Sequence, residues 1–416
     1  MKRLFLIAVA ASAAVASADM MDRPTGFKIG QRMTVRPYVA LYYTFDSNVN
    51  STRHSSKRDG SSFNINPGFL ATYNGDNWDL GAGAYYQHHF HSRNTSNMDT
   101  DSYGQNLAFT WSNTKNGGKG WSLNLRESYA FISQDDDMTN HEGRGVGRDR
   151  REFQLGGTLQ HRFNERWHAA VDSTYYLIDY VNDTKKYAGL YGWKRWSVGG
   201  NAGFVASQWT DLLIGANYQG YTQDNDRDLS RGSEGTKKRG RRLASESKGW
   251  TVQAGIGTHA TERISYRVMA GYSGFEYAGG VSKSHGFTYQ ITGNWKISDT
   301  WNTMLMASSM YQPSEREYGS AIRVDMVSWG VAHTMVRGKL NASFDMNYRH
   351  EQHEYTEYYA SDYDSDIMTA RVGLNYTLNR FVTLFTTAEY QDFMSHDRSL
   401  YDYDRWRLSV GLRLTY

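Results

Sequence analysis

The chain has 416 residues, a net charge of +3, no cysteine and 14% aromatic residues. The near balance of 46 basic and 43 acidic residues gives no reason to expect nucleic-acid binding. The lack of cysteine excludes disulfides and thiolate metal sites, and the aromatic content is unlike that of a disordered chain.

The N-terminus has the features of a secretory signal peptide. Lys2 and Arg3 form a basic region, an apolar stretch follows over residues 4–15, and residues 16–18 (Ala-Ser-Ala) form a small-x-small cleavage site. We therefore expect residues 1–18 to be removed on export and residues 19–33 to form a periplasmic N-terminal segment. No later apolar run approaches the roughly 18 residues that a membrane helix needs.

From residue 34 onward, apolar and polar residues alternate in recurring runs. One run sets Leu340, Ala342, Phe344, Met346 and Tyr348 against polar residues. A period of two places apolar side chains on one face of a strand and polar ones on the other. The pattern predicts eighteen strands, at residues 34–45, 62–73, 78–91, 103–113, 120–133, 150–163, 166–180, 191–206, 209–223, 249–260, 263–277, 285–297, 300–312, 322–336, 338–350, 366–378, 380–393 and 404–416.

The connections between these strands alternate between short and long. Short ones include residues 74–77 and 164–165, whereas residues 134–149 and 224–248 form long polar ones. This alternation is typical of an outer-membrane barrel, in which short turns face the periplasm and long loops face outside. The sheet must close, because every backbone N–H and C=O in lipid needs a partner. We therefore predict one all-β domain over residues 34–416, an antiparallel transmembrane β-barrel of about eighteen strands. A secreted sandwich or solenoid is the soluble alternative.

Aromatic residues gather at both ends of the predicted strands. We expect a periplasmic girdle beside the short turns and an outer girdle toward the long loops, where amphipathic rings meet lipid headgroups. Ordinary packing of aromatics within a sheet is the alternative. The periplasmic set is Trp78, Trp121, Trp167, Trp250, Trp295 and Trp301, and the outer set is Tyr86, Phe90, Tyr129, Phe131, Tyr175, Tyr348, Tyr390 and Trp406.

The last strand, residues 404–416, shows the pattern most clearly. Its apolar positions are predicted to face lipid, while Arg407, Ser409 and Arg413 face a wet lumen. The end of the strand, with Leu412, Leu414 and Tyr416, resembles the C-terminal signal by which bacterial outer-membrane barrels are recognised for assembly. The resemblance implies the barrel assembly machinery as a partner, although most such signals end in Phe or Trp.

The first predicted strands carry a more specific resemblance. The segment RPYVALYYTFDSNVN, residues 36–50, ends in an aromatic-Asp-x-Asn-Val pattern at Phe45, Asp46, Asn48 and Val49, and a Pro-Gly follows at residues 67–68. Over about the first 60 mature residues the chain resembles a family of outer-membrane β-barrel porins, some of which resemble barrels encoded with exopolysaccharide export systems. The resemblance implies the outer membrane of a Gram-negative bacterium, with lipid and lipopolysaccharide around the barrel. It also implies a hydrophilic solute or polysaccharide as cargo and, for an export outlet, a periplasmic partner.

The polar face of the strands defines the candidate pore lining. It carries eight cations, Arg126, Arg162, Arg267, Lys296, Arg349, Arg371, Arg407 and Arg413, and the acids Asp79, Asp172, Asp345 and Glu389. One interpretation is a solvated wall with opposite charges paired across strands. The other is a net-positive lumen that favours anionic solutes. Inward Tyr85, Tyr176 and Phe385 are either sugar-stacking platforms or wall packing.

Four residues break the expected pattern. His88 and Glu127 fall on the nominal lipid face, where a charge costs free energy, so either the register slips through a bulge or this face meets another subunit. We expect the slip. Pro37 and Pro67 lie inside strands and remove ladder donors, which a bulge would accommodate.

No motif for covalent catalysis is present, and no metal or cofactor site is expected. His89 and His91 share a strand face and could share a metal, but a polar wall is the preferred interpretation. The acidic and basic long loops are expected to be solvated. The alternatives are calcium or lipopolysaccharide binding and, for the basic loop, folding inward to constrict the pore. The sequence predicts a porin-like channel for hydrophilic solutes, with an exopolysaccharide outlet as its specialised form. A plugged structural or adhesive barrel and a barrel-embedded lipid hydrolase are the alternatives.

Overall fold

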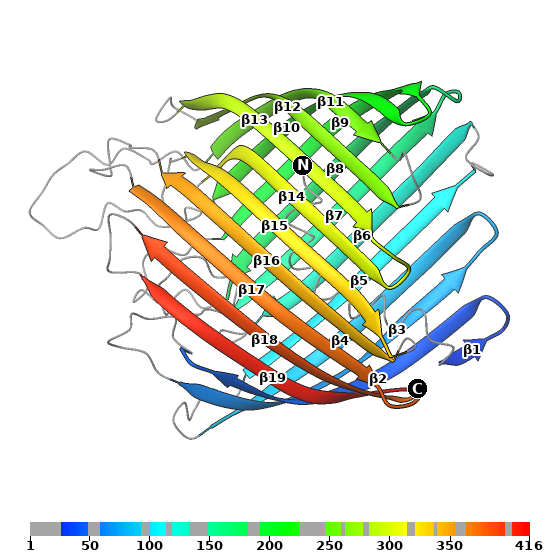
Figure 1. Cartoon of the computed structure of the whole chain (residues 1–416), viewed down its shortest axis with the longest axis vertical. Helices are drawn as coiled ribbons and strands as arrows, with labels where there is room; N and C mark the ends of the chain where they lie inside the picture. Colours follow the sequence, from blue (N-terminus) through cyan, green and yellow to red (C-terminus); the bar gives the residue numbers. More distant parts are fainter. Residues whose placement is uncertain are drawn as a thin grey trace, which may run out of the picture.

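The protein folds into a sheet of antiparallel strands that closes on itself (Figure 1). The computed structural model describes residues 26–48, 59–92, 100–113, 119–132, 149–181, 192–223, 246–258, 263–277, 283–313, 321–336, 339–353, 363–395 and 402–416. The strands are β1 (Phe27–Ile29), β2 (Met33–Asp46), β3 (Gly60–Asn74), β4 (Trp78–His91), β5 (Thr100–Ser112), β6 (Gly120–Ile132), β7 (Arg150–Arg162), β8 (Trp167–Tyr180), β9 (Trp193–Ser207), β10 (Thr210–Gln223), β11 (Glu246–Thr258), β12 (Ile264–Tyr277), β13 (Lys283–Lys296), β14 (Trp301–Pro313), β15 (Ala321–Met335), β16 (Leu340–His353), β17 (Tyr363–Thr377), β18 (Val382–Ser395) and β19 (Tyr403–Thr415).

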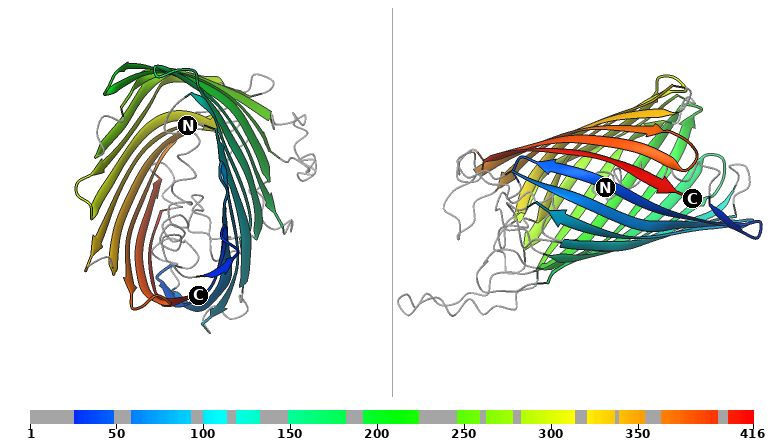
Figure 2. Two further views of the ribbon diagram at one scale, coloured as in Figure 1. Left: turned by 90° about the vertical axis from the view of Figure 1, so that its right-hand side faces the viewer. Right: turned by 90° about the horizontal axis from the view of Figure 1, so that it is seen from below.

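The closed barrel consists of β2 to β19. Each strand pairs antiparallel with the next, and β19 returns to β2 with Arg407 opposite Asp46 and Thr415 opposite Tyr38. The eighteen-strand antiparallel barrel predicted from the sequence is thus confirmed. Viewed along its axis, the wall encloses an elongated interior (left panel of Figure 2). None of the described segments is a helix long and apolar enough to cross a membrane.

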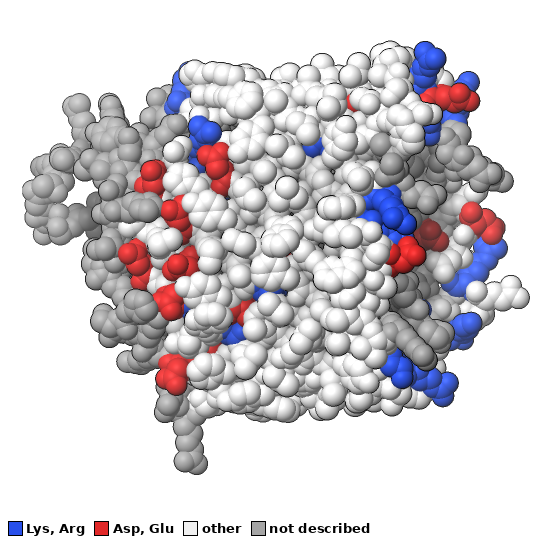
Figure 3. All heavy atoms as spheres, viewed as in Figure 1, with Lys and Arg blue, Asp and Glu red and all other residues white. Residues whose placement is uncertain are grey.

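The two faces of the wall differ as the alternation predicts. Large apolar side chains point outward and are about half exposed, as at Val171 (55%), Ile214 (57%) and Val410 (53%). The positions between them point inward and include buried polar residues such as Ser308 and Thr383. The middle of the face seen in Figure 3 is mostly white, with few acids or bases, as expected for a lipid-facing surface.

The aromatic girdles need one correction. Trp78, Trp167 and Trp301 begin strands that follow short connections, as expected for the periplasmic rim. Trp250 does not belong with them, because β11 starts after the long connection from residue 223 to 246 and Trp250 lies near that start. It lies opposite Tyr218 and near Tyr272, in the outer girdle.

The expected register slips do not occur. The register is unchanged through Leu107–Glu127–Leu155 and through Ile65–His88–Asp101, so Glu127 and His88 both face outward. The described pairings do contain a register shift elsewhere, in the β9–β10 pair between Thr210 and Asp211. The slip predicted at Glu127 and His88 is therefore wrong.

The structure explains His88 by its position at the extracellular end of β4. His88 Nδ1 lies 2.6 Å from Asp101 Oδ1, and the Tyr86 hydroxyl donates to the same oxygen. The same arrangement recurs on β16 and β17, where Tyr348 and His350 both contact Asp366. Each aspartate lies directly opposite its histidine on the next strand. These polar groups satisfy one another at the rim, where the membrane interface is wet.

The two prolines are accommodated without bulges, so that expectation is also wrong. The carbonyl of Pro37 accepts from the Tyr416 N–H at 3.1 Å. In an antiparallel sheet the N–H and C=O of one residue point to the same neighbouring strand, which for Pro37 is β19. The N–H that Pro37 lacks would therefore point to the end of β19, where the ladder of hydrogen bonds stops. Pro67 lies where β3–β4 pairing is interrupted between Ile65–His88 and Gly68–Tyr85, with no shift of register.

Candidate channel wall

The structure places every predicted pore-lining residue on the inner face of the barrel. On β19, for example, Trp406, Leu408 and Val410 are exposed outward, so Arg407 and Ser409 between them point inward. The inner wall is not uniform around the barrel. Its charges concentrate on the strands next to the β19–β2 seam, while β4 to β8 present mainly hydroxyl and amide groups. That a solute passes these residues stays a prediction.

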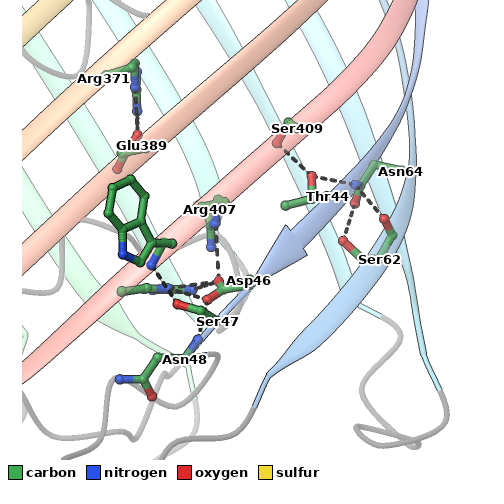
Figure 4. A network of polar contacts seen from close by, with 12 residues as sticks. Thr44, Asp46, Ser47, Asn48, Ser62, Asn64, Arg371, Glu389, Arg407 and Ser409 are labelled. Atoms are coloured by element: carbon green, nitrogen blue, oxygen red, sulfur yellow. Dashed lines mark hydrogen bonds and ion pairs between the residues drawn. The ribbon is translucent and has the colours of Figure 1, made fainter. Parts of the chain in front are cut away.

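A row of alternating charges crosses five neighbouring strands. Asp345, Arg371, Glu389, Arg407 and Asp46 lie directly opposite one another in sequence from β16 to β2. We call this row the charge ladder. Arg371 Nε donates to Glu389 Oε2 at 2.7 Å, and Arg407 Nε donates to Asp46 Oδ2 at 3.3 Å (Figure 4). For these groups the interpretation of paired charges on a solvated wall is favoured.

Asp46 is the centre of the closing seam. Its two oxygens accept from Arg405 Nε at 2.9 and 2.8 Å, and Oδ1 also accepts from the Asn48 N–H at 3.0 Å. The side chains of Arg405 and Asp46 are only 4% and 9% exposed. Burying the two charges costs desolvation free energy, which is offset because they form a hydrogen-bonded ion pair with each other.

The seam also explains the segment on which the family resemblance rests. Besides the Asp46 pairs, the Asn48 amide donates to the Asp404 carbonyl at 3.0 Å. Ser47 Oγ accepts from the Trp406 N–H at 2.7 Å (Figure 4). The residues following the first strand therefore bind the start of the last one. Arg405 was missed by sequence reasoning, although it shares a strand face with Arg407.

A second polar network continues the wall toward β3. Thr44 Oγ1 lies 2.9 Å from Ser409 Oγ and accepts from the Asn64 amide at 3.2 Å, and Ser62 donates to Asn64 Oδ1 at 3.2 Å (Figure 4). Asn64 has no exposed surface. At these residues the inner face of the seam is thus a hydrogen-bonded polar surface.

The remaining predicted cations have varied surroundings. Arg349 pairs with Glu351 at 2.5 Å, and Lys296 pairs with Asp299 at 2.9 Å in the turn before β14. The hydrogen bond from Lys296 holds the pKa of the exposed Asp299 carboxyl below its usual value. Arg162 donates to the backbone carbonyls of its own turn. Arg126 differs, because within the described strands it has no ion-pair partner.

The inward aromatic residues are integrated into the wall. The Tyr176 hydroxyl donates to Glu152 at 2.9 Å. Phe385 lies 5.8 Å from the ring of Tyr42 and 5.7 Å from the Arg413 guanidinium. Gly411 lies between Phe385 and Tyr42 in the sheet, and the two rings can approach each other because glycine has no side chain there. These contacts favour wall packing over free sugar-stacking platforms.

The wall of β4 to β8 is polar but less charged. Its inward row sets Asp79, Thr110, Asn124, Thr158 and Asp172 opposite one another. A shallow hollow of about 510 Å³ lies at the periplasmic end of β4 to β7, with Ser112, Ser122 and Gln160 also in its lining. Groups of this kind exchange hydrogen bonds with water or with sugar hydroxyls. Among the described residues, no cluster of three or more His, Asp or Glu could hold a metal ion.

The fold, the lipid-facing band and the polar interior define an antiparallel β-barrel of the bacterial outer-membrane type. Residues 234–416 match the family model described as "Putative beta-barrel porin 2", which confirms the predicted resemblance to outer-membrane β-barrel porins. The match covers the C-terminal part of the chain, so the N-terminal segment at Asp46 lies outside it. No curated protein sequence matches the chain.

Solved structures with a similar outline include an iron transporter and two outer-membrane proteins. The FrpB iron transporter from Neisseria meningitidis (F3-3 variant) aligns with 89% of this chain at 12% identity and a TM-score of 0.45, and the chain spans only 64% of that protein. OpdK from Pseudomonas aeruginosa is 11% identical over 92% of this chain and 99% of its own, with a TM-score of 0.44. The channel DcaP of Acinetobacter baumannii is 12% identical over 94% and 100%, with a TM-score of 0.41. We base no conclusion about solutes on likenesses this distant.

Proposed function

We propose that the protein is a passive diffusion channel for hydrophilic solutes, with a mainly charge-balanced lumen. The observation that carries the proposal is the polar, hydrogen-bonded inner wall, in which the three acids of the charge ladder are balanced by Arg371, Arg407 and the Arg405 that also pairs with Asp46. A barrel of about 16–18 strands encloses an aqueous channel unless it is plugged. No covalent step is needed, because the wall replaces part of the water around a diffusing solute.

The charge balance bears on selectivity. Because Arg371 and Arg407 are paired with acids, they contribute little net field to the lumen. Arg126, which has no ion-pair partner among the described residues, gives the wall of β6 a positive charge. We expect weak anion preference and easy passage of neutral solutes. The more specific form of the proposal is an outlet for an exopolysaccharide, which the hydroxyl and amide row of β4 to β8 supports by its chemistry.

The test is conductance of the purified barrel in a planar bilayer, together with swelling of proteoliposomes in neutral saccharides of increasing length. A diffusion channel gives steady conductance steps and admits monosaccharides and disaccharides. An outlet would also admit long neutral oligosaccharides. A barrel that conducts no ions and admits no sugar is a structural or adhesive barrel, and the proposal then fails.

A further inference from the structure

Two polar side chains lie at mid-depth on the outer face of the barrel without partners. Glu127 lies near the middle of β6, opposite the lipid-facing Leu107 and Leu155, which are 46% and 47% exposed. Its Oε2 atom is buried and has no hydrogen-bond partner among the described residues. Gln105, one pair away on β5, is exposed on the same face, and its amide is also unpartnered within the described strands.

Other outward polar residues behave differently. Thr303 on β14 donates to the Gly330 carbonyl at 2.9 Å and accepts from Trp329 at 3.0 Å. Thr386 on β18 donates to the Ser409 carbonyl at 3.0 Å. The wall itself therefore satisfies these hydroxyls. At Glu127 and Gln105 it does not, and hydrocarbon cannot supply the missing hydrogen bonds.

The surface beside these residues is also hollowed. A depression of about 530 Å³ is lined by the outward residues Ala84, Tyr103, Gln105 and Tyr129, together with Tyr85 and Gly104 of the inner face. Small Ala84 and the gap around Gln105 leave room for side chains of a partner. The polar pair and the hollow lie side by side on β4 to β6, on a face that otherwise resembles the lipid-facing band.

We propose that this face binds a second copy of the chain. A carboxylate accepts hydrogen bonds, and an amide can donate them. In a two-fold dimer the Glu127 of each copy can therefore accept from the Gln105 of the other, so that the patch is complementary to itself. Association removes the exposed Gln105 amide from lipid and supplies a donor to the Glu127 carboxylate. The dimer would be independent of whether the lumen conducts.

The absence of cysteine makes the test direct. Leu107→Cys places a thiol opposite Glu127, and Val327→Cys places one at 44% exposure on β15, half-way around the barrel. Full-length protein in native membranes is treated with a membrane-permeable oxidant. We expect a disulfide-linked dimer from Leu107→Cys and at least ten-fold less from Val327→Cys. Leu155→Cys serves if Leu107→Cys does not assemble.

Two substitutions then separate hydrogen bonding from simple proximity. Glu127→Leu should reduce the cross-linked dimer at least ten-fold, although it makes the lipid face more apolar, whereas Glu127→Gln should retain it. The wild-type particle in lipid nanodiscs should have a mass near twice that of one chain. A monomeric particle, equal cross-linking at both positions, a dimer indifferent to Glu127→Leu, or cross-links only to another protein would each overturn the proposal.

Discussion

The rings of Phe27 and Tyr416 lie 4.4 Å apart, so the first described strand contacts the final residue of the chain. β1 pairs with Met33–Val35 of β2, beyond the point where β19 stops at Tyr38. Tyr416 also stacks on Phe381 at 5.9 Å. The two ends of the chain thus share one edge of β2, and Tyr416 fills the junction between them.

This contact predicts that Phe27 contributes to barrel stability. An aromatic pair is worth about 0.5–1.5 kcal/mol beyond its buried area, so Phe27→Ala should lower the unfolding free energy by about 1 kcal/mol. The temperature at which the folded band disappears on gels should fall accordingly. Tyr416→Phe preserves the ring and should behave as wild type. If Phe27→Ala and Phe27→Tyr are equally stable, the contact is not stabilising.

The buried pair at the seam should be the most sensitive electrostatic contact. Asp46→Asn leaves the Arg405 guanidinium buried without a counter-charge, which costs about 3–5 kcal/mol. Urea unfolding in lipid vesicles should show this loss. Asp345→Asn, at the far end of the charge ladder, should cost much less. The double variant Asp46→Asn/Arg405→Gln should recover part of the loss, and a double variant no better than Asp46→Asn would contradict the pairing.

Ion selectivity should depend on unpaired charge and be insensitive to paired charge. Arg126→Glu changes the lumen by two charges and should move the reversal potential toward cation preference. Exchanging the ladder pair by Arg371→Glu with Glu389→Arg keeps the net charge and the contact, so the reversal potential should stay at the wild-type value. The measurement is a planar bilayer under a salt gradient. Equal shifts in both proteins would show that the ladder does not neutralise itself.

Close packing across the seam should make Gly411 intolerant of a side chain. A Cβ there would lie 2.3 Å from the Tyr42 Cβ and 2.4 Å from the Leu41 carbonyl. Gly411→Ala should therefore cost about 1–3 kcal/mol and lower the yield of folded barrel. Gly293 lies on the outer face with no heavy atom within 4 Å of such a Cβ. Gly293→Ala is the matched control and should fold as wild type; if the two glycines tolerate alanine equally, the close approach has no energetic consequence.

The sequence by itself determined the strands and their faces. Alternation with a period of two is a local property, so each strand end could be predicted to within about three residues, and the lipid-facing stripe of β19 could be read from Trp406 to Leu414. The alternation of short and long connections then required an even, closed barrel. Trp250 was misplaced because the rim on which a residue lies depends on strand direction as well as on position near a strand end.

The tertiary structure alone decided how the barrel closes and which charges meet. Asp46 and Arg405 are 359 residues apart, and their contact depends on the register between the first and last barrel strands, which no local pattern encodes. The sequence likewise gave no means of telling a register slip at Glu127 from a true outward carboxylate. The unbroken pairing of Glu127 with Leu107 and Leu155 shows that its side chain faces outward. Register is defined by how neighbouring strands pair, so it could be read only from the three-dimensional structure.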